Sequence, residues 1–171
     1  MFDPTIFDNL KVVIEGAVYD QDLEGRLNVI DRSDRIDLAI MSRKFYLFFQ
    51  LPNQTRSTCR WELTSTLDQL SNEILAKSDL TGQGCSTNVE FTVKVPQEEH
   101  LLQMIQTIMD NVWGDRNKEY TLLSPYPLLK DVQFKVKITF DRVIYEEDID
   151  DLLLMFSFME DTLKLLQQNG Y

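Results

Sequence analysis

The sequence predicts an α+β fold: an antiparallel N-terminal strand meander followed by a β-α-β-α half, forming one twisted sheet with helices packed mainly on one face. Three observations predict it. Apolar and polar residues alternate along 89–95 and 132–140, the period of a strand with one buried face. Apolar residues recur at helical spacing over 101–112. A run of acidic residues at 146–151 precedes a long apolar segment, as at the start of a helix.

The first 50 residues contain short apolar runs separated by turn-forming residues. Residues 11–19 are apolar on both faces of an extended chain, so they are expected to form a central strand. The turn residues 20–25 precede a short expected strand at 26–30, and residues 31–34 form the next expected turn. This pattern predicts antiparallel strands joined by tight turns.

The strands that follow are more apolar. Residues 36–41 alternate in polarity, and 42–44 are expected to close a hairpin. The run 45–51 is the most aromatic strand of the chain, and Pro52 ends it because proline cannot donate to a sheet ladder. These segments predict a meander of three or four strands, and a further short strand is expected at 59–63.

Two helices are predicted between these strands and the C-terminal acids. Ser65 and Asp68 have the spacing of an N-cap with an acidic third residue, and apolar residues repeat at helical intervals to about Lys77. The second helix is expected to begin at Pro96, whose missing amide costs little in a first turn. Gly114 is its expected C-terminal stop.

The length and composition fit one domain. A chain of 171 residues with 43% hydrophobic content can bury an ordinary core without disulfides or metals. We therefore expect a single domain over 1–171. The loop-like segment 78–87 could join two sub-regions, 1–80 and 88–171.

The charge balance disfavours nucleic acid as a partner. The chain has 28 Asp and Glu against 17 Lys and Arg, a net charge of −11, and residues 146–171 alone contribute −6. Phosphate contact requires clustered basic residues, which this acidic protein lacks. No apolar run approaches the roughly 18 residues of a membrane span, and the N-terminus has no basic leader region. We expect a cytoplasmic protein with neither a nucleic-acid nor a membrane partner.

The last helix has more apolar surface than one core face requires. One stripe consists of Ile149, Leu152, Leu153, Phe156, Met159, Leu163 and Leu166. Leu154, Phe158 and Leu165 fall nearly opposite it. A helix that is apolar on two sides is wedged between two layers. One layer is expected to be the sheet and the other a second copy of the chain or a different protein, so Leu154, Phe158 and Leu165 are the predicted partner-binding residues.

The acids before this helix are the weak candidates for a metal site. Glu147 and Asp151 are four residues apart, and Asp148 and Asp151 are three apart, so each pair can share a helix face. Hard cations such as Mg²⁺ bind carboxylate oxygens. The alternative is a solvated cap, because negative charge is favourable at a helix N-terminus.

No catalytic constellation is found in the sequence. His100 is the only histidine and is expected at the surface, beside Glu98 and Glu99. Cys59 and Cys85 have no metal-ligand or redox spacing and are expected to be idle thiols. The Gly-x-Gly at 82–84 follows a predicted helix and precedes a strand, which is the reverse of a phosphate-binding loop. The sequence therefore indicates no catalytic residue and no cofactor.

The leading hypothesis is a non-enzymatic protein-interaction or regulatory protein that self-associates as a homodimer through its C-terminal helix. The two-sided helix and the lack of catalytic signatures favour it. One alternative is a small carboxylate-dependent metal-binding protein or enzyme that uses the acids at 147–151. A second alternative is an acidic inhibitor that docks on a basic partner.

Overall fold

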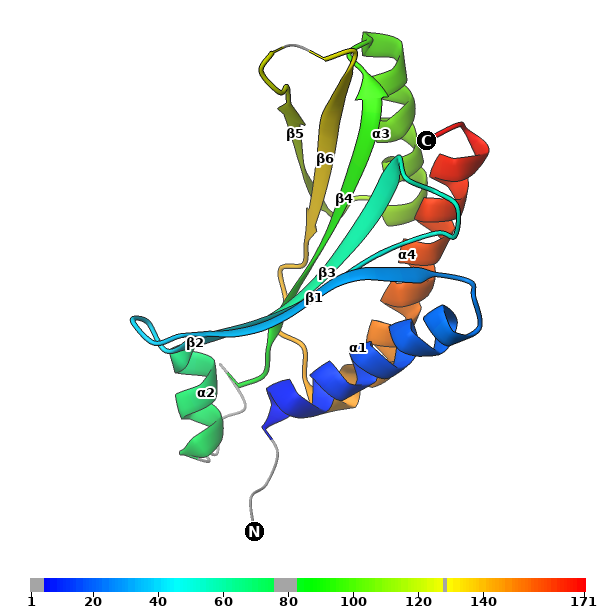
Figure 1. Cartoon of the computed structure of the whole chain (residues 1–171). Helices are drawn as coiled ribbons and strands as arrows, with labels where there is room; N and C mark the ends of the chain where they lie inside the picture. The colour runs from blue at the N-terminus through cyan, green and yellow to red at the C-terminus, as the bar shows by residue number, and fades with distance from the viewer. Residues whose placement is uncertain (1–4, 76–82, 128) are drawn as a thin grey trace.

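The computed structural model describes residues 5–75, 83–127 and 129–171. Within them, six strands form one antiparallel sheet against which helices pack (Figure 1). The elements in chain order are α1 (Ile6–Leu23), β1 (Asn28–Asp37), β2 (Ser42–Gln50), β3 (Ser57–Ser65), α2 (Leu67–Ile74), β4 (Ser86–Pro96), α3 (Glu99–Trp113), β5 (Asn117–Leu123), β6 (Asp131–Thr139), a 3₁₀ turn (Glu146–Asp148) and α4 (Ile149–Gln168). The predicted α+β class is confirmed.

The strand order is β1-β2-β3-β4-β6-β5. Strands β1 to β4 are successive antiparallel neighbours, so the predicted meander is present. Helix α3 and strand β5 then come before β6, which pairs with β4 on one side and with β5 on the other. The second half of the chain therefore adds two strands to the sheet beyond β4, with β5 at the edge.

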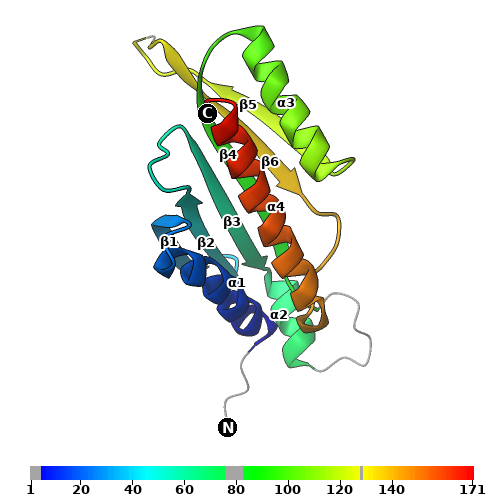
Figure 2. The ribbon, with the colours of Figure 1, turned by 90° about the vertical axis from the view of Figure 1, so that its right-hand side faces the viewer.

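Helices α1, α3 and α4 lie on the same face of the sheet, and α4 runs between the other two (Figure 2). Along β3, β4 and β6, alternate side chains are buried under these helices. The side chains between them face the other way and are mostly polar, so the core lies in one layer between sheet and helices. The prediction of helices packed mainly on one face is confirmed.

Aromatic side chains join α4 to the sheet. Phe156 of α4 stacks on Trp61 of β3, with ring centroids 5.9 Å apart, and meets Phe49 of β2 edge-on at 5.9 Å. Trp61 Nε1 donates to Thr87 Oγ1 at 3.1 Å, so its polar edge is satisfied inside the core. These contacts seat the long helix on the centre of the sheet.

The expected central strand at 11–19 is wrong, because these residues belong to α1. Phe7, Leu10, Ile14 and Val18 are buried at intervals of three and four residues, the period of a helix. Thr5 caps the helix by accepting a hydrogen bond from the Asp8 amide. A helical stripe includes both odd-numbered and even-numbered positions, because its residues are three and four apart. On an extended chain the same residues would therefore lie on both faces, as in a central strand.

The expected turn at 31–34 is also wrong, because β1 continues through it to Asp37 and the chain turns at 38–41 instead. Consequently 36–41 is not a strand of its own, and 42–44 lie in β2. Turn-forming residue types are tolerated here because β1 is an edge strand and its charges pair with α1, as Arg32 Nε does with Glu15 at 2.7 Å. The register shifts between Val29 and Asp31, so β1 also carries a bulge.

Helix boundaries differ from the predictions by a few residues. The N-cap of α2 is Thr66 rather than Ser65, and Thr66 and Gln69 form a reciprocal capping box. Pro96 is the last residue of β4, and α3 begins at Glu99. Gly114 ends α3 with a positive φ of 58°, as predicted. Residues 76–82 lie outside the described residues. They include the expected helix end near residue 77 and the first part of the expected linker at 78–87.

A charged network fastens α1 to the β1–β2 hairpin. Asp34 accepts hydrogen bonds from Arg43 Nε and Nη2, at 3.1 and 2.8 Å, and from Lys11 Nζ at 2.7 Å. Arg43 Nη1 also pairs with Asp8 of α1 at 2.7 Å. These hydrogen bonds, first of all those from Arg43, lower the pKa of Asp34 to about 2.

Asp34→Asn should lower the free energy of unfolding by about 1–2 kcal/mol near neutral pH. Because the folded state lowers the pKa of Asp34 from its usual 3.8, the stabilisation is fully present above that value and is lost as the pH falls toward 2. Urea unfolding at about pH 3 should therefore show roughly half the difference seen near neutral pH. Asp20→Asn removes the same charge from an exposed site of α1 and should have little effect; an equal loss in both variants would contradict the assignment.

Candidate functional site

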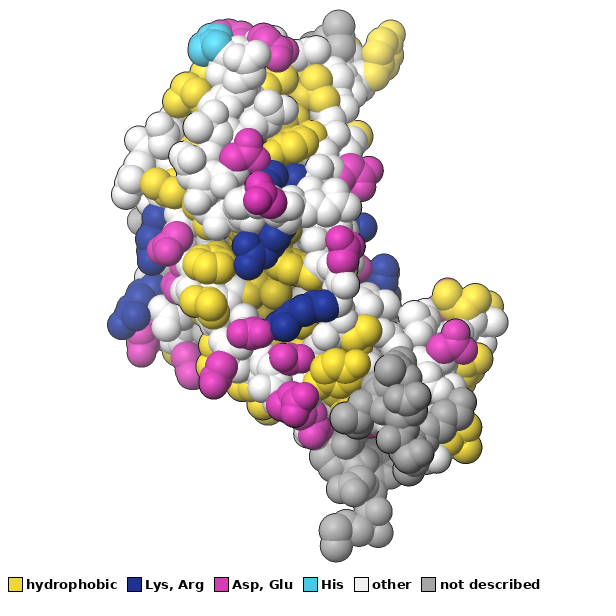
Figure 3. All heavy atoms as spheres, turned by 180° about the vertical axis from the view of Figure 1, so that it is seen from behind, with side chains coloured by type: hydrophobic (Ala, Val, Ile, Leu, Met, Phe, Trp, Pro, Cys, Tyr) yellow, Lys and Arg dark blue, Asp and Glu magenta, His cyan; other side chains and the backbone are white. Residues whose placement is uncertain are grey.

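A hollow of about 440 Å³ opens where the C-terminal end of α3, the end of β6 and the side of α4 meet. Hydrophobic side chains form its floor, with Lys and Arg side chains beside them and acids around them (Figure 3). Its lining residues are Trp113, Asp115, Arg116, Asn117, Thr139, Phe140, Asp141, Arg142, Asp151, Leu154, Met155 and Phe158. We call it the Arg116 hollow. It includes Asp151 from the candidate metal site and Leu154 and Phe158 from the predicted partner-binding residues.

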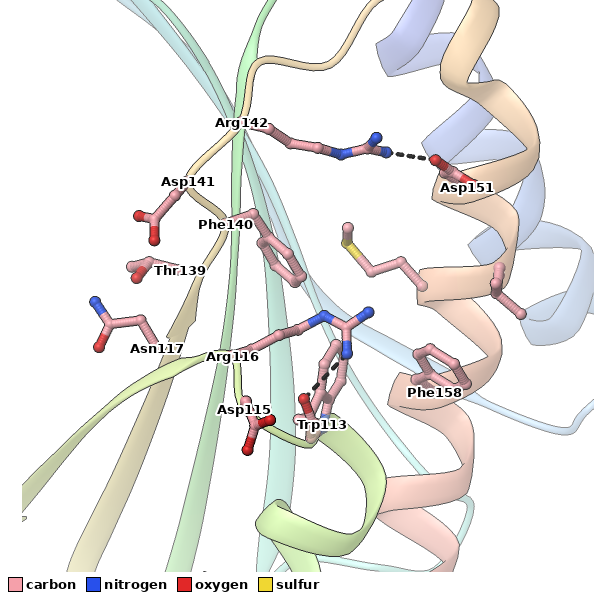
Figure 4. A pocket seen from close by; sticks show the side chains of 12 residues that line it. Trp113, Asp115, Arg116, Asn117, Thr139, Phe140, Asp141, Arg142, Asp151 and Phe158 are labelled. Atoms are coloured by element: carbon pink, nitrogen blue, oxygen red, sulfur yellow. Dashed lines mark hydrogen bonds and ion pairs between the residues drawn. The ribbon is translucent and has the colours of Figure 1, made fainter.

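The Arg116 side chain is held in this hollow by contacts with carbonyl and aromatic groups. Its Nη1 donates to the Trp113 carbonyl oxygen at 3.0 Å, and its guanidinium lies 6.0 Å from the Phe140 ring centroid and 5.8 Å from that of Phe158. Arg116, Phe140 and Arg142 extend toward α4, whereas Asp141 points away from it (Figure 4). Within residues 5–75, 83–127 and 129–171, Arg116 forms no ion pair with a carboxylate.

The second arginine of the hollow is neutralised by the predicted metal candidates. Arg142 pairs with Asp151 at 2.5 Å and with Asp148 at 3.7 Å. Asp148 also accepts the Tyr145 amide at 2.9 Å, so it caps the 3₁₀ turn, whereas Glu147 is exposed. Among the described residues, no three Asp, Glu, His or Cys side chains are grouped as a metal site would need. Asp148 caps the 3₁₀ turn, and both Asp148 and Asp151 have Arg142 as their ionic partner at the negatively charged start of α4.

Helix α3 covers much of the predicted partner-binding stripe. The ring of Phe158 meets Trp113 of α3 edge-on, with centroids 5.9 Å apart, and Leu165 is partly buried against the core. Leu154 is 54% exposed and Leu153 is 43% exposed. The second layer around α4 is therefore supplied largely by α3 of the same chain. Leu154 is exposed and lines the hollow, whereas Leu153 is exposed but is not one of the lining residues.

A larger exposed apolar surface lies at the other end of the sheet. It consists of Ile36, Leu38, Ile40 and Met41 in and beside the β1–β2 turn, and Leu67, Ile74 and Leu75 in and beside α2. In the sheet, Arg43 at the start of β2 lies opposite Ser65 at the end of β3. The β1–β2 turn therefore lies next to the start of α2 (Figure 1; right edge of Figure 3). We call this the hairpin–α2 surface.

Sequence reasoning missed the hairpin–α2 surface because its signal is ambiguous. The alternation at 36–41 predicts a strand, and the helical spacing of apolar residues after Ser65 predicts a helix, but neither pattern says whether these residues are covered. Of the eight residues of α2, however, only Gln69 is buried. The periodicity indicates which residues share a face, but not whether the chain covers that face.

The sulfur and imidazole groups do not form a catalytic pair. Cys59 and Cys85 are free and buried, and burial raises their pKa, that of Cys85 to about 12. His100 is at the surface, as predicted, with Nδ1 3.6 Å from a Glu98 carboxylate oxygen. Thiols that stay protonated near neutral pH are poor nucleophiles.

Phe158→Ala should lower the free energy of unfolding by about 2–3 kcal/mol, because the ring packs on Trp113 and Arg116. Leu154→Ala should cost less than about 0.5 kcal/mol, because that side chain is largely exposed. Urea unfolding of both variants measures the difference. Similar losses would mean that the two residues share one environment, contrary to the structure.

None of the helices in the described ranges has the length and apolar character that crossing a membrane requires.

Comparison of the chain with protein-family models, with curated proteins and with solved structures finds no match.

Proposed function

We propose that this protein acts by non-enzymatic association and pairs with a second copy of itself through the hairpin–α2 surface. The observation that carries the proposal is the gathering of large exposed apolar side chains on two adjoining elements. A contiguous apolar patch of this kind on a folded protein marks an interaction surface, because its burial releases water from apolar area.

The state of α2 supports the proposal. A helix of eight residues is too short to be stable without packing, even with a capping box. Leu67 and Ile74 nevertheless leave much of their surface in water, and Ile74 is 70% exposed. A partner that covers this face would supply the packing that a short amphipathic helix needs.

A second copy is the partner that this surface suits best. In a two-fold dimer the same patch meets itself, so it must be complementary to itself. Apolar surface satisfies this condition, whereas a patch of one charge would repel its copy, above all in a chain with a net charge of −11.

The C-terminal helix remains the second candidate for the interface. The exposed leucines of α4 favour it, since Leu153 is 43% exposed and Leu154 is 54% exposed. Phe158 and Leu165 contribute less than the sequence suggested, because α3 packs against that side of the helix. The experiment below distinguishes the two surfaces.

The mass in solution, measured by light scattering after size exclusion, should be near twice 20.0 kDa and should not fall in high salt. Leu38→Ser with Ile40→Ser, and separately Ile74→Lys, should shift the protein toward the monomer mass, because each removes apolar surface from the interface. A lysine near a helix C-terminus is compatible with the helix dipole, so α2 should persist in circular dichroism.

The matched control is Leu153→Ser with Leu154→Ser, which removes a comparable exposed apolar pair from α4. It should leave the dimer intact. If only this control dissociates the protein, the interface lies on α4 and the hairpin–α2 proposal is wrong. A monomeric wild-type protein at high concentration would overturn self-association at either surface.

A further inference from the structure

We propose that the Arg116 hollow binds a small organic acid that carries one carboxylate next to a bulky apolar group. The hollow is separate from the hairpin–α2 surface, so this inference does not depend on self-association. Its volume of about 440 Å³ lies within the range of small-molecule sites in proteins. Apolar and polar side chains both line the hollow. Sites for small molecules combine apolar contact with a few polar groups that fix the orientation of the ligand.

The cation of the site is Arg116. Its guanidinium is fixed by the Trp113 carbonyl and by two aromatic rings, which leaves other N–H donors of the fork for a ligand. Arg142 in the same hollow already pairs with Asp148 and Asp151. Arg116 has no such carboxylate among the residues that the structure describes, although acids outnumber bases in this chain. A ligand would supply the missing anion in a geometry that a planar guanidinium recognises well.

The apolar part of the ligand has a floor to lie on. Phe140 and Phe158 lie next to the guanidinium, and Met155 and the exposed Leu154 also line the hollow. Phe140 and Arg116 both point toward α4 (Figure 4). An aromatic or branched aliphatic group two or three bonds from the carboxylate would therefore contact these side chains while the carboxylate meets Arg116.

The charge around the hollow selects a monoanion. Asp115, Asp141 and Asp151 line it as well, and Asp151 is neutralised by its pair with Arg142. The two remaining carboxylates oppose a dianion more strongly than a monoanion, because the repulsion grows with ligand charge. Inorganic phosphate, which also lacks the apolar group, should therefore bind poorly.

The test uses 3-phenylpropionate, its neutral amide 3-phenylpropanamide, acetate and inorganic phosphate as probes. Binding to the full chain is followed by NMR, through the indole N–H of Trp113 and the methyl group of Met155. We expect saturable binding of 3-phenylpropionate. Each of the other three probes should bind at least about 10-fold more weakly, because the amide lacks the charge that meets Arg116 and acetate and phosphate lack the apolar group.

Arg116→Gln should weaken 3-phenylpropionate at least about 10-fold and should leave the amide nearly unchanged. Arg26→Gln is the matched control, because it removes the same charge from an exposed arginine paired with Glu24, and it should bind as the wild type does. If Arg116→Gln fails to fold, the wild-type comparison of acid with amide still decides. Equal binding of acid and amide, equal binding of phosphate, or no saturable shift would overturn the proposal.

Discussion

The sheet carries its core on one face only, and the rest of the fold depends on how α4 covers that face. Phe156 stacks on Trp61 and touches Phe49, so the helix lies directly over the central strands. Along the same helix, Met159, Leu163 and Leu166 are fully buried. With α4 in the middle, α1 and α3 each have a defined place on either side of it (Figure 2). The hydrophobic face of the sheet is thereby sealed without a second sheet.

The same packing explains why a hollow exists. Helix α3 ends at Gly114 while α4 extends beyond it, so the corner between the end of β6 and α4 has no helix above it. The connection from α3 to β5 passes this corner and places Arg116 in it. Trp113, whose Nε1 donates to Thr162 of α4 at 3.0 Å, fixes the last turn of α3 against α4 and so fixes the start of that connection.

The sequence predicts best those elements in which apolar residues recur with one clear period. Strands β4 and β6 alternate strictly because one face is buried and the other is polar, and α4 begins within a run of acids, with Asp150 and Asp151 in its first turn. Residues 11–19 predict a strand because they are rich in Val and Ile, which favour strands but are also compatible with the helix α1. Strand β1 was interrupted in the prediction because residues that favour turns, such as Asp34, form tertiary ion pairs instead.

The site was predictable only in part. Leu154 and Phe158 were singled out from the helical wheel, and both line the Arg116 hollow. No local pattern marks Arg116, because its aromatic contacts, Phe140 just after β6 and Phe158 in α4, come from farther along the chain. Exposure also cannot be read from periodicity, so the sequence did not reveal that the apolar face of α2 is left open. Both features arise from tertiary packing.

The bulge and the charges of β1 have a consequence for how assembly can proceed. An edge strand of ten residues offers unpaired backbone groups to any other strand, and such edges can lead to fibres. Here the bulge after Val29 breaks the regular ladder, and charged residues such as Arg35 would have to be desolvated against an incoming strand. If two copies meet at the adjoining hairpin turn, as proposed above, they would do so through side chains in a closed pair, and such an assembly would stop at two copies instead of growing along the sheet.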